Sequence, residues 1–478
     1  MTGALAHLLE QPAAATARVV GDANPGFADG AALASAADAV AARLGAAGID
    51  PREPILVSVA NRPADLAALF GVWRAGGVVV PIHAAAAEAT RAEVRSQTGA
   101  RFLLDGAELI RVADAPPPPR PLLEKAALII FTSGSTGRPK GVVVGHDGLA
   151  AKLDVLARLL EIGPDDEVIL PLQLIFIFGV WVGLLSVSRG ARLRLVTKFT
   201  PQGMREALPS GTVFAGVPSM LRAMFGDGTV VAPGLRAILT GGEALGPLLS
   251  AQLDLHLPQT DVFDLYGLTE TGSCDFCLLP SDRMGGANSV GRPTEGVTYR
   301  ILDAAGEEVE PDASGELSIR TPFGMLGYLD NPTLTQDSFR DGHFRTGDLA
   351  RLRSDGFVEI VGRIKEIISR GGNKIAPAEI ELMLLQHPDV AHALCAGVPD
   401  PRLGEAVHAA VVPRAGSALE GQALKAWCAE RIERFKVPDT IHLVDALPTG
   451  PTGKAWRGGI KLLAEATPNA GVPGGGKS

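Results

Sequence analysis

One stretch of this chain has the residue types of a phosphate-binding loop. An apolar segment that begins at Leu128 leads into TSGSTGRPKG, residues 132–141. Glycines let the backbone turn its N–H groups toward one concavity, and hydroxyls and a lysine add donors and positive charge. The candidate phosphate ligands are Thr132, Ser133, Gly134, Ser135, Thr136, Gly137 and Lys140. The stretch is not a Walker A loop, and taken alone it fits a flexible surface loop equally well.

TSGSTGRPKG resembles the signature loop of the adenylate-forming superfamily, which contains acyl-CoA and aryl-CoA synthetases, peptide-synthetase adenylation domains and beetle luciferases. Four further stretches resemble the other motifs of this family, in its order and roughly its spacing. They are DLYGLTETG at 264–272, FRTGDL at 344–349, GRIKEIISRGGNKIAPAEIE at 362–381 and PTGPTGK at 448–454. On these motifs the chain is identified as a member of the superfamily, in its acyl-CoA/aryl-CoA synthetase branch.

The resemblance implies roles for residues around the triphosphate. An enzyme that joins a carboxylic acid to AMP brings two anions together, so it needs clustered positive charge and a metal. Thr269 is expected at the phosphates and Glu270 at a Mg²⁺ ion, while Tyr266 is expected to lie against adenine. Outside such a motif, Glu270 would be explained as a turn cap and Tyr266 as a core residue.

The resemblance also implies contacts to the nucleoside. Asp348 is expected to accept hydrogen bonds from both ribose hydroxyls, and Arg363 to donate to the same sugar. Gly242 and Glu243, in TGGEAL, resemble the segment that flanks adenine. Glycine pairs are also common in turns, which is the alternative explanation of this segment.

Residues with expected roles in the two half-reactions lie near the C-terminus. By resemblance, Lys454 bridges the carboxylate and the α-phosphate and supplies electrostatic stabilisation; the alternative is an exposed loop lysine. Lys365 occupies the hinge position, where backbone rotation exchanges the faces of the small domain. Gly371 and Gly372 are expected in the CoA channel, where a side chain would block the pantetheine arm. Lys374 is assigned to the same channel, although a turn would explain it equally well.

The acyl end departs from common family patterns. Phe176 stands where many CoA ligases have a gating histidine, and Gly179 where amino-acid-activating domains carry an aspartate. Without that charge the pocket should take an uncharged acyl group. The candidate pocket residues are Phe176, Gly179, Phe214, Gly216, Pro218, Gly267 and Cys274. Their apolar walls and small residues favour an aromatic, benzoate-type acid, followed by a small to medium aliphatic acid.

Cys274 and Cys277 form a CxxC pattern that resembles a metal or redox site. The chain has no second such pair and no histidine near this one. We therefore interpret the two cysteines as small hydrophobic residues behind the acyl pocket.

The composition is that of a globular protein. Its 478 residues suffice for two or three domains, with 46% hydrophobic and 20% charged residues. Lys and Arg total 44 against 53 for Asp and Glu, a net charge of -9, so no basic face for nucleic acid is predicted. Four scattered cysteines fit a reducing cytoplasm. The longest apolar stretch, 168–187, is broken by Pro and Gly and predicts buried strand and helix rather than a membrane span.

The elements that position these residues follow from periodicity. Alanine-rich segments with helical spacing alternate with short β-branched segments, which predicts α/β layers with parallel strands. We predict a large AMP-binding domain at 1–362, built from layered α/β subdomains plus a β-rich subdomain. A small mobile α+β domain at 363–465 carries the hinge and the catalytic lysine, and a disordered tail follows at 466–478.

These features predict a cytoplasmic, ATP-dependent carboxylic acid:CoA ligase. It would form acyl-AMP and pyrophosphate, and then move the acyl group to the CoA thiol with release of AMP; ATP, Mg²⁺ and CoA are implied by the resemblance. The alternative is a freestanding adenylation enzyme that loads the pantetheine of a carrier protein. A catalytically silent nucleotide-binding protein is disfavoured because Lys140, Glu270, Asp348 and Lys454 are all present. Luciferase-type oxidation has no specific support.

Overall fold

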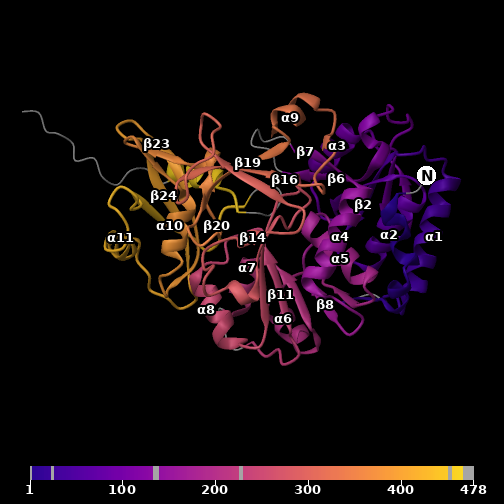
Figure 1. Cartoon of the computed structure of the whole chain (residues 1–478), viewed down its shortest axis with the longest axis horizontal. Coiled ribbons are helices and arrows are strands. Elements are labelled where there is room, and N and C mark those ends of the chain that lie inside the picture. Colours follow the sequence, from indigo (N-terminus) through magenta and orange to yellow (C-terminus); the bar gives the residue numbers. More distant parts are fainter. Residues whose placement is uncertain (1–2, 23–25, 133–138, 226–229, 450–454, 467–478) are drawn as a thin grey trace, which may run out of the picture. The chain divides into compact units, whose positions relative to one another are not determined.

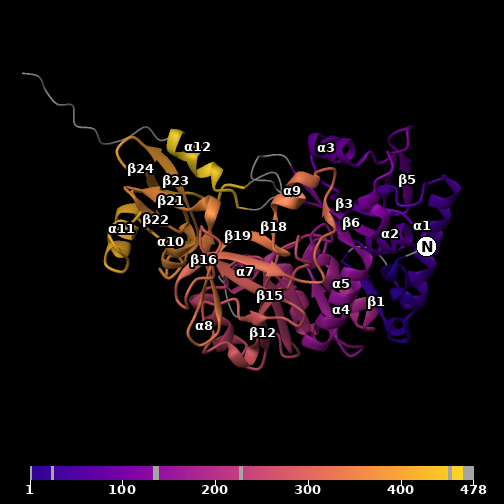
Figure 2. The same cartoon turned by 45° about the horizontal axis from the view of Figure 1, so that its top comes forward.

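The computed structural model describes residues 3–22, 26–132, 139–225, 230–449 and 455–466, and its elements are labelled in Figures 1 and 2. The chain divides into two units. The first unit comprises Met1–Leu245, Gln252–Arg300 and Ser318–Thr346, and the second comprises Gly246–Ala251, Ile301–Leu317 and Gly347–Ser478. The division at residue 362 that the motifs suggest stays a prediction.

An eight-stranded sheet of the first unit has the order β1-β9-β8-β10-β11-β12-β13-β14. Its strands are β1 (Arg18–Gly21), β9 (Arg192–Leu195), β8 (Glu167–Leu170), β10 (Val213–Gly216), β11 (Ala237–Gly241), β12 (Asp261–Tyr266), β13 (Phe276–Leu278) and β14 (Arg292–Pro293). The pairs from β1 to β12 are parallel, whereas β13 and β14 run antiparallel. Parallel strands end at one edge of a sheet, and that edge is where ligands of α/β folds bind.

The second sheet of this unit is seven-stranded, with the order β17-β7-β6-β3-β2-β4-β5. Its strands are β17 (Gly327–Tyr328), β7 (Lys140–Gly145), β6 (Ala126–Thr132), β3 (Val78–His83), β2 (Pro54–Val59), β4 (Phe102–Asp105) and β5 (Glu108–Arg111). Strands β6 and β7 form an antiparallel pair that aligns Thr132 with Lys140. Strand β17 adds to β7 and aligns Tyr328 with Val142.

Helices of the first unit cover these sheets. They are α1 (Gly30–Ala46), α2 (Pro63–Arg74), α3 (Glu88–Thr98), α4 (His146–Leu160), α5 (Ile177–Ser188), α6 (Pro201–Ala207), α7 (Pro218–Phe225) and α9 (Pro332–Asp337). Helices α1 and α2 lie side by side in Figure 1. Helix α5 is apolar all round and nearly fully buried, as expected of a helix inside a core. The interrupted apolar stretch predicted as strand and helix is thus β8 and α5.

The second unit has its own sheet and core. The sheet has the order β22-β21-β24-β23, and β25 pairs with β24. Its elements are β21 (Ile368–Arg370), β22 (Asn373–Ile375), β23 (Val390–Asp400), β24 (Gly404–Pro413), β25 (Thr440–Leu443), α10 (Pro377–Leu384), α11 (Gly421–Ala429) and α12 (Gly458–Ala466). Helix α12 packs on β23, as Figure 2 shows. Buried residues such as Ile380, Val407 and Leu424 form the core beneath α10 and α11.

A further five-stranded sheet is built from short strands and corresponds to the predicted β-rich subdomain. It has the order β15-β16-β19-β18, with β20 paired to β19. Its strands are β15 (Thr298–Leu302), β16 (Ser314–Arg320), β18 (Phe339–Arg340), β19 (His343–Leu352) and β20 (Val358–Arg363). Helix α8 spans Pro247–His256. In the part of the chain that the structure describes, no helix is long and apolar enough to cross a membrane.

Asn61 connects the two sheets of the first unit. It follows β2 with a φ of 58°, and its side chain is fully buried. Its amide donates to the carbonyls of Leu172 (2.8 Å) and Val196 (3.2 Å), which follow β8 and β9. Its side-chain oxygen accepts from the N–H of Leu174 at 3.0 Å. Asparagine suits this position because it tolerates the left-handed conformation and satisfies buried backbone groups.

We expect Asn61→Ala to lower the free energy of unfolding by roughly 2–4 kcal/mol, because it leaves backbone groups unpaired and puts alanine in the left-handed region. Urea denaturation measures the change. Asn331→Ala is the control: it removes one helix-capping bond, to the N–H of Leu334, and should cost about 1 kcal/mol. Equal losses in the two variants would contradict the connecting role of Asn61.

Candidate active site

Three neighbouring strands bring motif residues to one edge of the eight-stranded sheet. Strands β10, β11 and β12 pair in parallel, so Gly216, Gly241 and Tyr266 lie at their carboxyl ends. Gly242 follows β11 with a φ of 81°, a conformation that favours glycine. The expected acyl and adenine residues of three separate motifs therefore share this edge.

The loop after β12 folds back on its own strand. The N–H of Asp275 donates to the Tyr266 carbonyl at 2.7 Å, and the N–H of Ser273 donates to the Leu268 carbonyl at 2.8 Å. A Cβ atom on Gly267 would lie 2.4 Å from the backbone nitrogen of Cys274, so only glycine fits there. The fold-back leaves Thr269 and Glu270 in the turn, and both are half-buried.

A tyrosine connects the phosphate loop to the candidate metal ligand. The Tyr328 hydroxyl donates to Glu270 Oε1 at 3.1 Å. The ammonium of Lys140 lies over the same ring, 5.5 Å from its centroid. Burial, reinforced by Glu270, raises the pKa of Tyr328, so its hydroxyl stays a donor. We call Lys140, Tyr328 and Glu270 the phosphate-side cluster.

The phosphate-side cluster fits a magnesium ion that arrives with its nucleotide. Among the described residues, no group of three or more His, Cys, Asp or Glu side chains could form a metal cage. Mg²⁺ commonly binds to one or two carboxylates and completes its coordination with substrate phosphates and water. Glu270 offers one such carboxylate, oriented by Tyr328. The ion would neutralise phosphate charge when bound.

Asp348 and Arg363, the expected ribose residues, are cross-strand neighbours on β19 and β20. The nitrogen Nε of Arg363 lies 2.9 Å from Asp348 Oδ1. The Asp348 side chain is 3% exposed, whereas that of Arg363 is 59% exposed. The structure therefore brings together the two residues that were assigned to one sugar.

Glu243 already has partners for its carboxylate. It accepts hydrogen bonds from the N–H and the hydroxyl of Ser219, at 3.0 and 2.8 Å, and pairs with Arg222 at 2.9 Å. These bonds fix the first turn of α7. Because the Glu243 carboxylate is engaged in these bonds, we expect the backbone of the 242–243 segment, rather than this side chain, to contact adenine.

The acyl candidates differ in how they are packed. Phe214 is fully buried, and its ring occupies the space next to Gly216, where a Cβ atom would lie 2.6 Å from it. Pro218 is buried at the start of α7, and Phe176 is half-buried before α5. A Cβ atom on Gly179 would lie 2.4 Å from the Gln173 carbonyl oxygen. An aspartate would not fit there without a backbone shift.

The two cysteines of the CxxC pattern are free and buried. Burial raises the pKa of the Cys274 thiol to about 12 and raises that of Cys277 as well. Both are therefore protonated and poorly reactive at neutral pH. This agrees with their interpretation as small hydrophobic residues.

The two glycines that the sequence assigns to the CoA channel, Gly371 and Gly372, form the turn between β21 and β22. Arg370 pairs with Asn373 across this turn. Gly371 and Gly372 both have positive φ, 55° and 86°, as in the type I′ turns of two-residue hairpins. Local conformation thus gives a reason for glycine that is independent of any ligand. Lys374 donates to the Ser369 hydroxyl at 2.7 Å.

Lys365, the expected hinge residue, lies in the short 3-10 helix Ile364–Glu366, and its side chain is exposed. Ser133, Gly134, Ser135, Thr136, Gly137 and Lys454 lie outside the described residues. Their assignments stay predictions. The strand ends that flank the first of these segments, Thr132 and Lys140, are aligned as a cross-strand pair.

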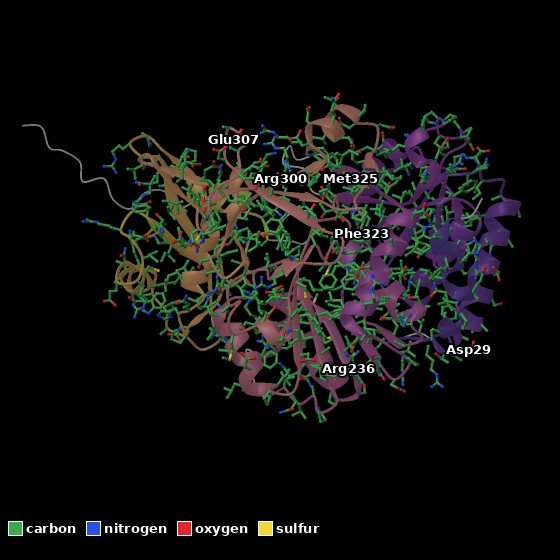
Figure 3. All side chains as sticks on the ribbon, in the orientation of Figure 1. Asp29, Arg236, Arg300, Glu307, Phe323 and Met325 are labelled. Atoms are coloured by element: carbon green, nitrogen blue, oxygen red, sulfur yellow. The ribbon has the colours of Figure 1, made fainter. Side chains whose placement is uncertain are left out.

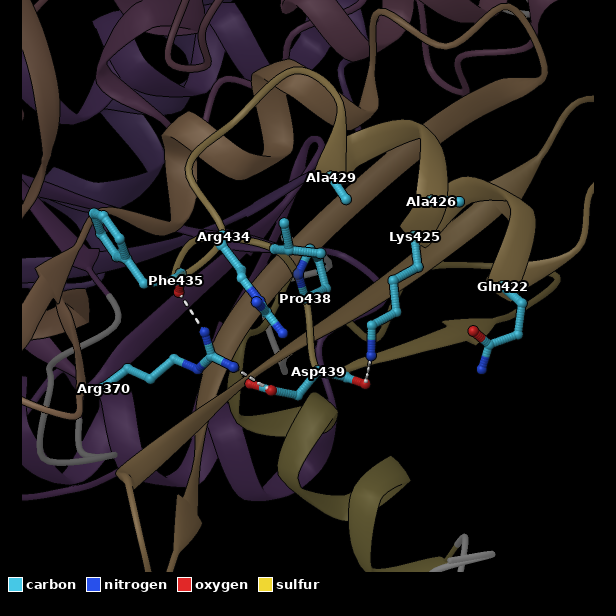
Figure 4. A pocket seen from close by; sticks show the side chains of 10 residues that line it. Arg370, Gln422, Lys425, Ala426, Ala429, Arg434, Phe435, Pro438 and Asp439 are labelled. Carbon is cyan, nitrogen blue, oxygen red and sulfur yellow. Dashed lines mark hydrogen bonds and ion pairs between the residues drawn. The ribbon is translucent and has the colours of Figure 1, made fainter.

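The second unit also contains a hollow of about 710 Å³, shown in Figure 4. Arg370, Lys425 and Arg434 line it, opposed by the Asp439 carboxylate. Arg370 donates to the Phe435 carbonyl at 2.6 Å and pairs with Asp439. We call this feature the cationic hollow, since three cations outnumber one carboxylate in a chain of net charge -9.

Sequence reasoning missed Tyr328 and Lys152. Tyr328 stands outside every motif, in MLGYLDN, and only the addition of β17 to β7 brings it near Lys140. Lys152 lies in the helical segment after the phosphate loop, where a lysine is usually solvated. Its side chain is instead fully buried. No spacing pattern marks either residue.

Comparison with known proteins gives the family. Residues 28–115 and 105–329 match the family of AMP-binding enzymes, and residues 379–454 match the C-terminal domain of AMP-binding enzymes. The chain belongs to the AMP-binding enzyme family. The superfamily predicted from the five motifs is confirmed.

Individual relatives extend over nearly the whole chain. A feruloyl-CoA synthase from Amycolatopsis sp is 32% identical over 445 residues, which cover 87% of this chain and 90% of that protein. The fatty acid–[acyl-carrier-protein] ligase ScoC of Streptomyces coeruleorubidus is 29% identical over 457 residues, with coverage of 87% and 88%.

Among solved structures, the O-succinylbenzoate coenzyme A synthetase of Bacillus subtilis, in complex with ATP and a magnesium ion, superposes with a TM-score of 0.82. It is 25% identical, and the match covers 96% of this chain and 98% of that one. The predicted fold, a large α/β domain followed by a smaller α+β domain, is confirmed.

We expect Tyr328→Phe to raise the Mg²⁺ concentration that gives half-maximal pyrophosphate release by about 10-fold, since a hydrogen bond to a charged group contributes roughly 1.5–3 kcal/mol. The ring beneath Lys140 is retained, whereas the hydroxyl and its bond to Glu270 are lost. A Mg²⁺ titration at saturating ATP measures the effect. The control is Tyr299→Phe, which removes the hydroxyl of a half-buried tyrosine on β15. An unchanged midpoint in Tyr328→Phe would remove Tyr328 from the metal site.

Proposed function

We propose that this protein is an ATP-dependent carboxylic acid:CoA ligase that works through an acyl-adenylate. The observation that carries the proposal is the phosphate-side cluster, which connects the expected phosphate lysine to the expected metal carboxylate. The relatives include a CoA synthase, and the class predicted from the sequence agrees with them. ATP, Mg²⁺ and CoA are the expected co-substrates and metal of this class.

In the first step, a carboxylate oxygen of the acid attacks the α-phosphorus of ATP, and pyrophosphate leaves. We assign Lys140 and the loop 132–137 to the phosphates, with Thr269 beside them. Glu270 would hold the metal ion, and Tyr328 would orient Glu270.

The nucleoside would be held by other residues. Asp348 and Arg363 would bind the ribose, while Tyr266 and the 242–243 backbone would flank adenine. Lys454 would stabilise the charge that develops between carboxylate and phosphate.

The acyl pocket supports an uncharged acid. Phe214 and Pro218 are buried apolar walls, and the packing around Gly179 leaves no place for a carboxylate that could pair with a substrate ammonium. We therefore propose an aromatic, benzoate-type acid, with small to medium aliphatic acids next. The test is kcat/KM for pyrophosphate release with benzoates, short aliphatic acids, long-chain acids and α-amino acids. A preference for an α-amino acid would overturn the pocket assignment.

In the second step, the thiol of CoA attacks the acyl carbonyl, and AMP leaves. We propose that the arm passes Gly371 and Gly372 and that Lys365 is the hinge between the two steps, with the domain boundary at residue 362. The cationic hollow begins at Arg370, directly before the two glycines, and we propose that it binds the phosphates of free CoA. We also propose a cytoplasmic location, because all four cysteines are free.

The alternative acceptor is the pantetheine of a carrier protein, which the likeness to ScoC favours. Both acceptors present the same arm, so the glycine turn does not separate them. The discriminating experiment compares thioester formation with free CoA and with a phosphopantetheinylated carrier protein. Saturation by CoA at ordinary concentrations supports the ligase, and turnover with the carrier protein alone supports the alternative.

We expect Lys454→Ala to slow acyl-AMP formation by about 10²–10³, the usual cost of one such contact. Thioester formation from supplied acyl-AMP should be nearly unchanged. Single-turnover assays of each half-reaction measure the two effects. Lys461→Ala, at an exposed lysine of α12, is the control, and equal losses in both half-reactions would remove Lys454 from the first step.

We expect the opposite asymmetry for Gly372→Leu, which should obstruct the pantetheine arm and spare acyl-AMP formation. Because Gly372 has positive φ, leucine also strains the turn. Gly416→Leu is matched for this strain, since Gly416 has a φ of 78° and equally open surroundings. Thioester formation that is no slower in Gly372→Leu than in Gly416→Leu would exclude Gly372 from the channel.

A further inference from the structure

Lys152 of helix α4 places a charge beneath the loop that follows β12. Its side chain is fully buried. The ammonium donates to the carbonyl of Cys274 at 2.6 Å and to the hydroxyl of Thr294 at 3.2 Å. It also lies 5.0 Å from the ring centroid of Phe323, a residue labelled in Figure 3. A buried lysine is rare, so this arrangement needs a reason beyond packing.

A buried carboxylate accompanies this ammonium. Asp275 is fully buried, and one of its oxygens accepts a hydrogen bond from the Thr271 hydroxyl. Burial raises the pKa of Asp275 to about 7, and the charge of Lys152 opposes that shift. Lys152 and Asp275 thus place two buried ionisable groups at the 271–275 segment, which makes the position of this segment costly to change.

The same segment has a strained backbone. Ser273 and Cys274 have φ values of 68° and 51°, in the left-handed region, where each non-glycine residue costs roughly 1–2 kcal/mol. Such strain persists only when surrounding contacts fix the conformation. Helix α5 supplies a second contact, because the Trp181 indole N–H donates to the Ser273 hydroxyl at 3.3 Å. Lys152 supplies the first.

The strained segment is the part of the loop after β12 that returns to the end of this strand. Cys274 and Asp275 contact Gly267 so closely that a Cβ atom there would overlap their backbone. We propose that Lys152 is a positioning residue for acid selectivity: it fixes the Ser273–Cys274 backbone against Gly267 and so sets the shape of the acyl pocket. The proposal rests on the assignment of Gly267 and Cys274 to that pocket. Lys152 itself does not touch the acid.

The test uses Lys152→Met, which keeps the length of the side chain and removes its charge. The readout is the ratio of kcat/KM for two acids that differ by one methyl group, with benzoate and 4-methylbenzoate as the first pair. This ratio does not depend on the fraction of active enzyme. We expect it to change by about 10-fold, the scale at which pockets distinguish one methylene.

Thr260→Val is the matched control. Thr260 directly precedes the N-terminal end of β12, away from the 271–275 segment. The substitution removes the buried hydrogen bond from its hydroxyl to the Leu235 carbonyl, at 2.7 Å. Its melting temperature should fall while its selectivity ratio stays at the wild-type value. If Lys152→Met lowers the melting temperature but leaves the kcat/KM ratio of the two acids at the wild-type value, the proposal is overturned, because Lys152 would then be only structural.

Thr294→Val keeps the test decisive if Lys152→Met does not fold. Thr294 bonds both to Lys152 and to the Cys274 carbonyl, at 3.2 and 2.8 Å. In Thr294→Val, the ratio of kcat/KM for the two acids should shift in the same direction as in Lys152→Met, by about 3-fold. A ratio equal to that of the wild type would overturn the proposal. Wild-type turnover is measured first on the full acid panel. Failure with every acid would overturn the proposed function and this inference together, whereas turnover with unchanged variant ratios would overturn the inference alone.

Discussion

Gly267 lets strand β12 end in contact with the backbone of Ser273, Cys274 and Asp275. Any side chain at this position would push the returning segment away from its strand. Tyr266, assigned to adenine, Glu270, assigned to the metal, and two of the acyl candidates, Gly267 and Cys274, lie at the end of β12 or on this loop, so its fold-back determines their spacing. The fold-back also requires left-handed backbone conformations at Ser273 and Cys274. The buried Lys152 and the indole of Trp181 bond to these two residues and hold them in place.

Positive charge is gathered at local positions in this acidic chain. Its net charge is -9, yet Lys140 is positioned over Tyr328, and three cations line the hollow of the second unit. Tyr328 joins the phosphate lysine to Glu270 without itself carrying a charge. Such pairing orients a carboxylate for a metal and keeps the lysine available for phosphate.

Much of the site was predictable because its backbone conformations demand particular residues. The glycines at 242, 267, 371 and 372 and the TETG turn are motif positions, and their φ values or close contacts explain them. Tyr328 and Lys152 were not predictable, because strand addition and a buried polar contact leave no periodic pattern in sequence. The assignment of the 242–243 segment to adenine stays a prediction, and the bonds of the Glu243 carboxylate to Ser219 and Arg222 leave no trace in sequence spacing either.

In the proposed reaction, the acid is activated as an acyl-adenylate and the acyl group is then passed to a thiol. An acid labelled with ¹⁸O in both carboxylate oxygens tests it directly. The carboxylate oxygen that attacks the α-phosphorus stays with the phosphate when the thiol displaces AMP. Mass spectrometry should therefore find one labelled oxygen in AMP and none in pyrophosphate. Unlabelled AMP, or label in released phosphate or pyrophosphate, would exclude an acyl-adenylate intermediate.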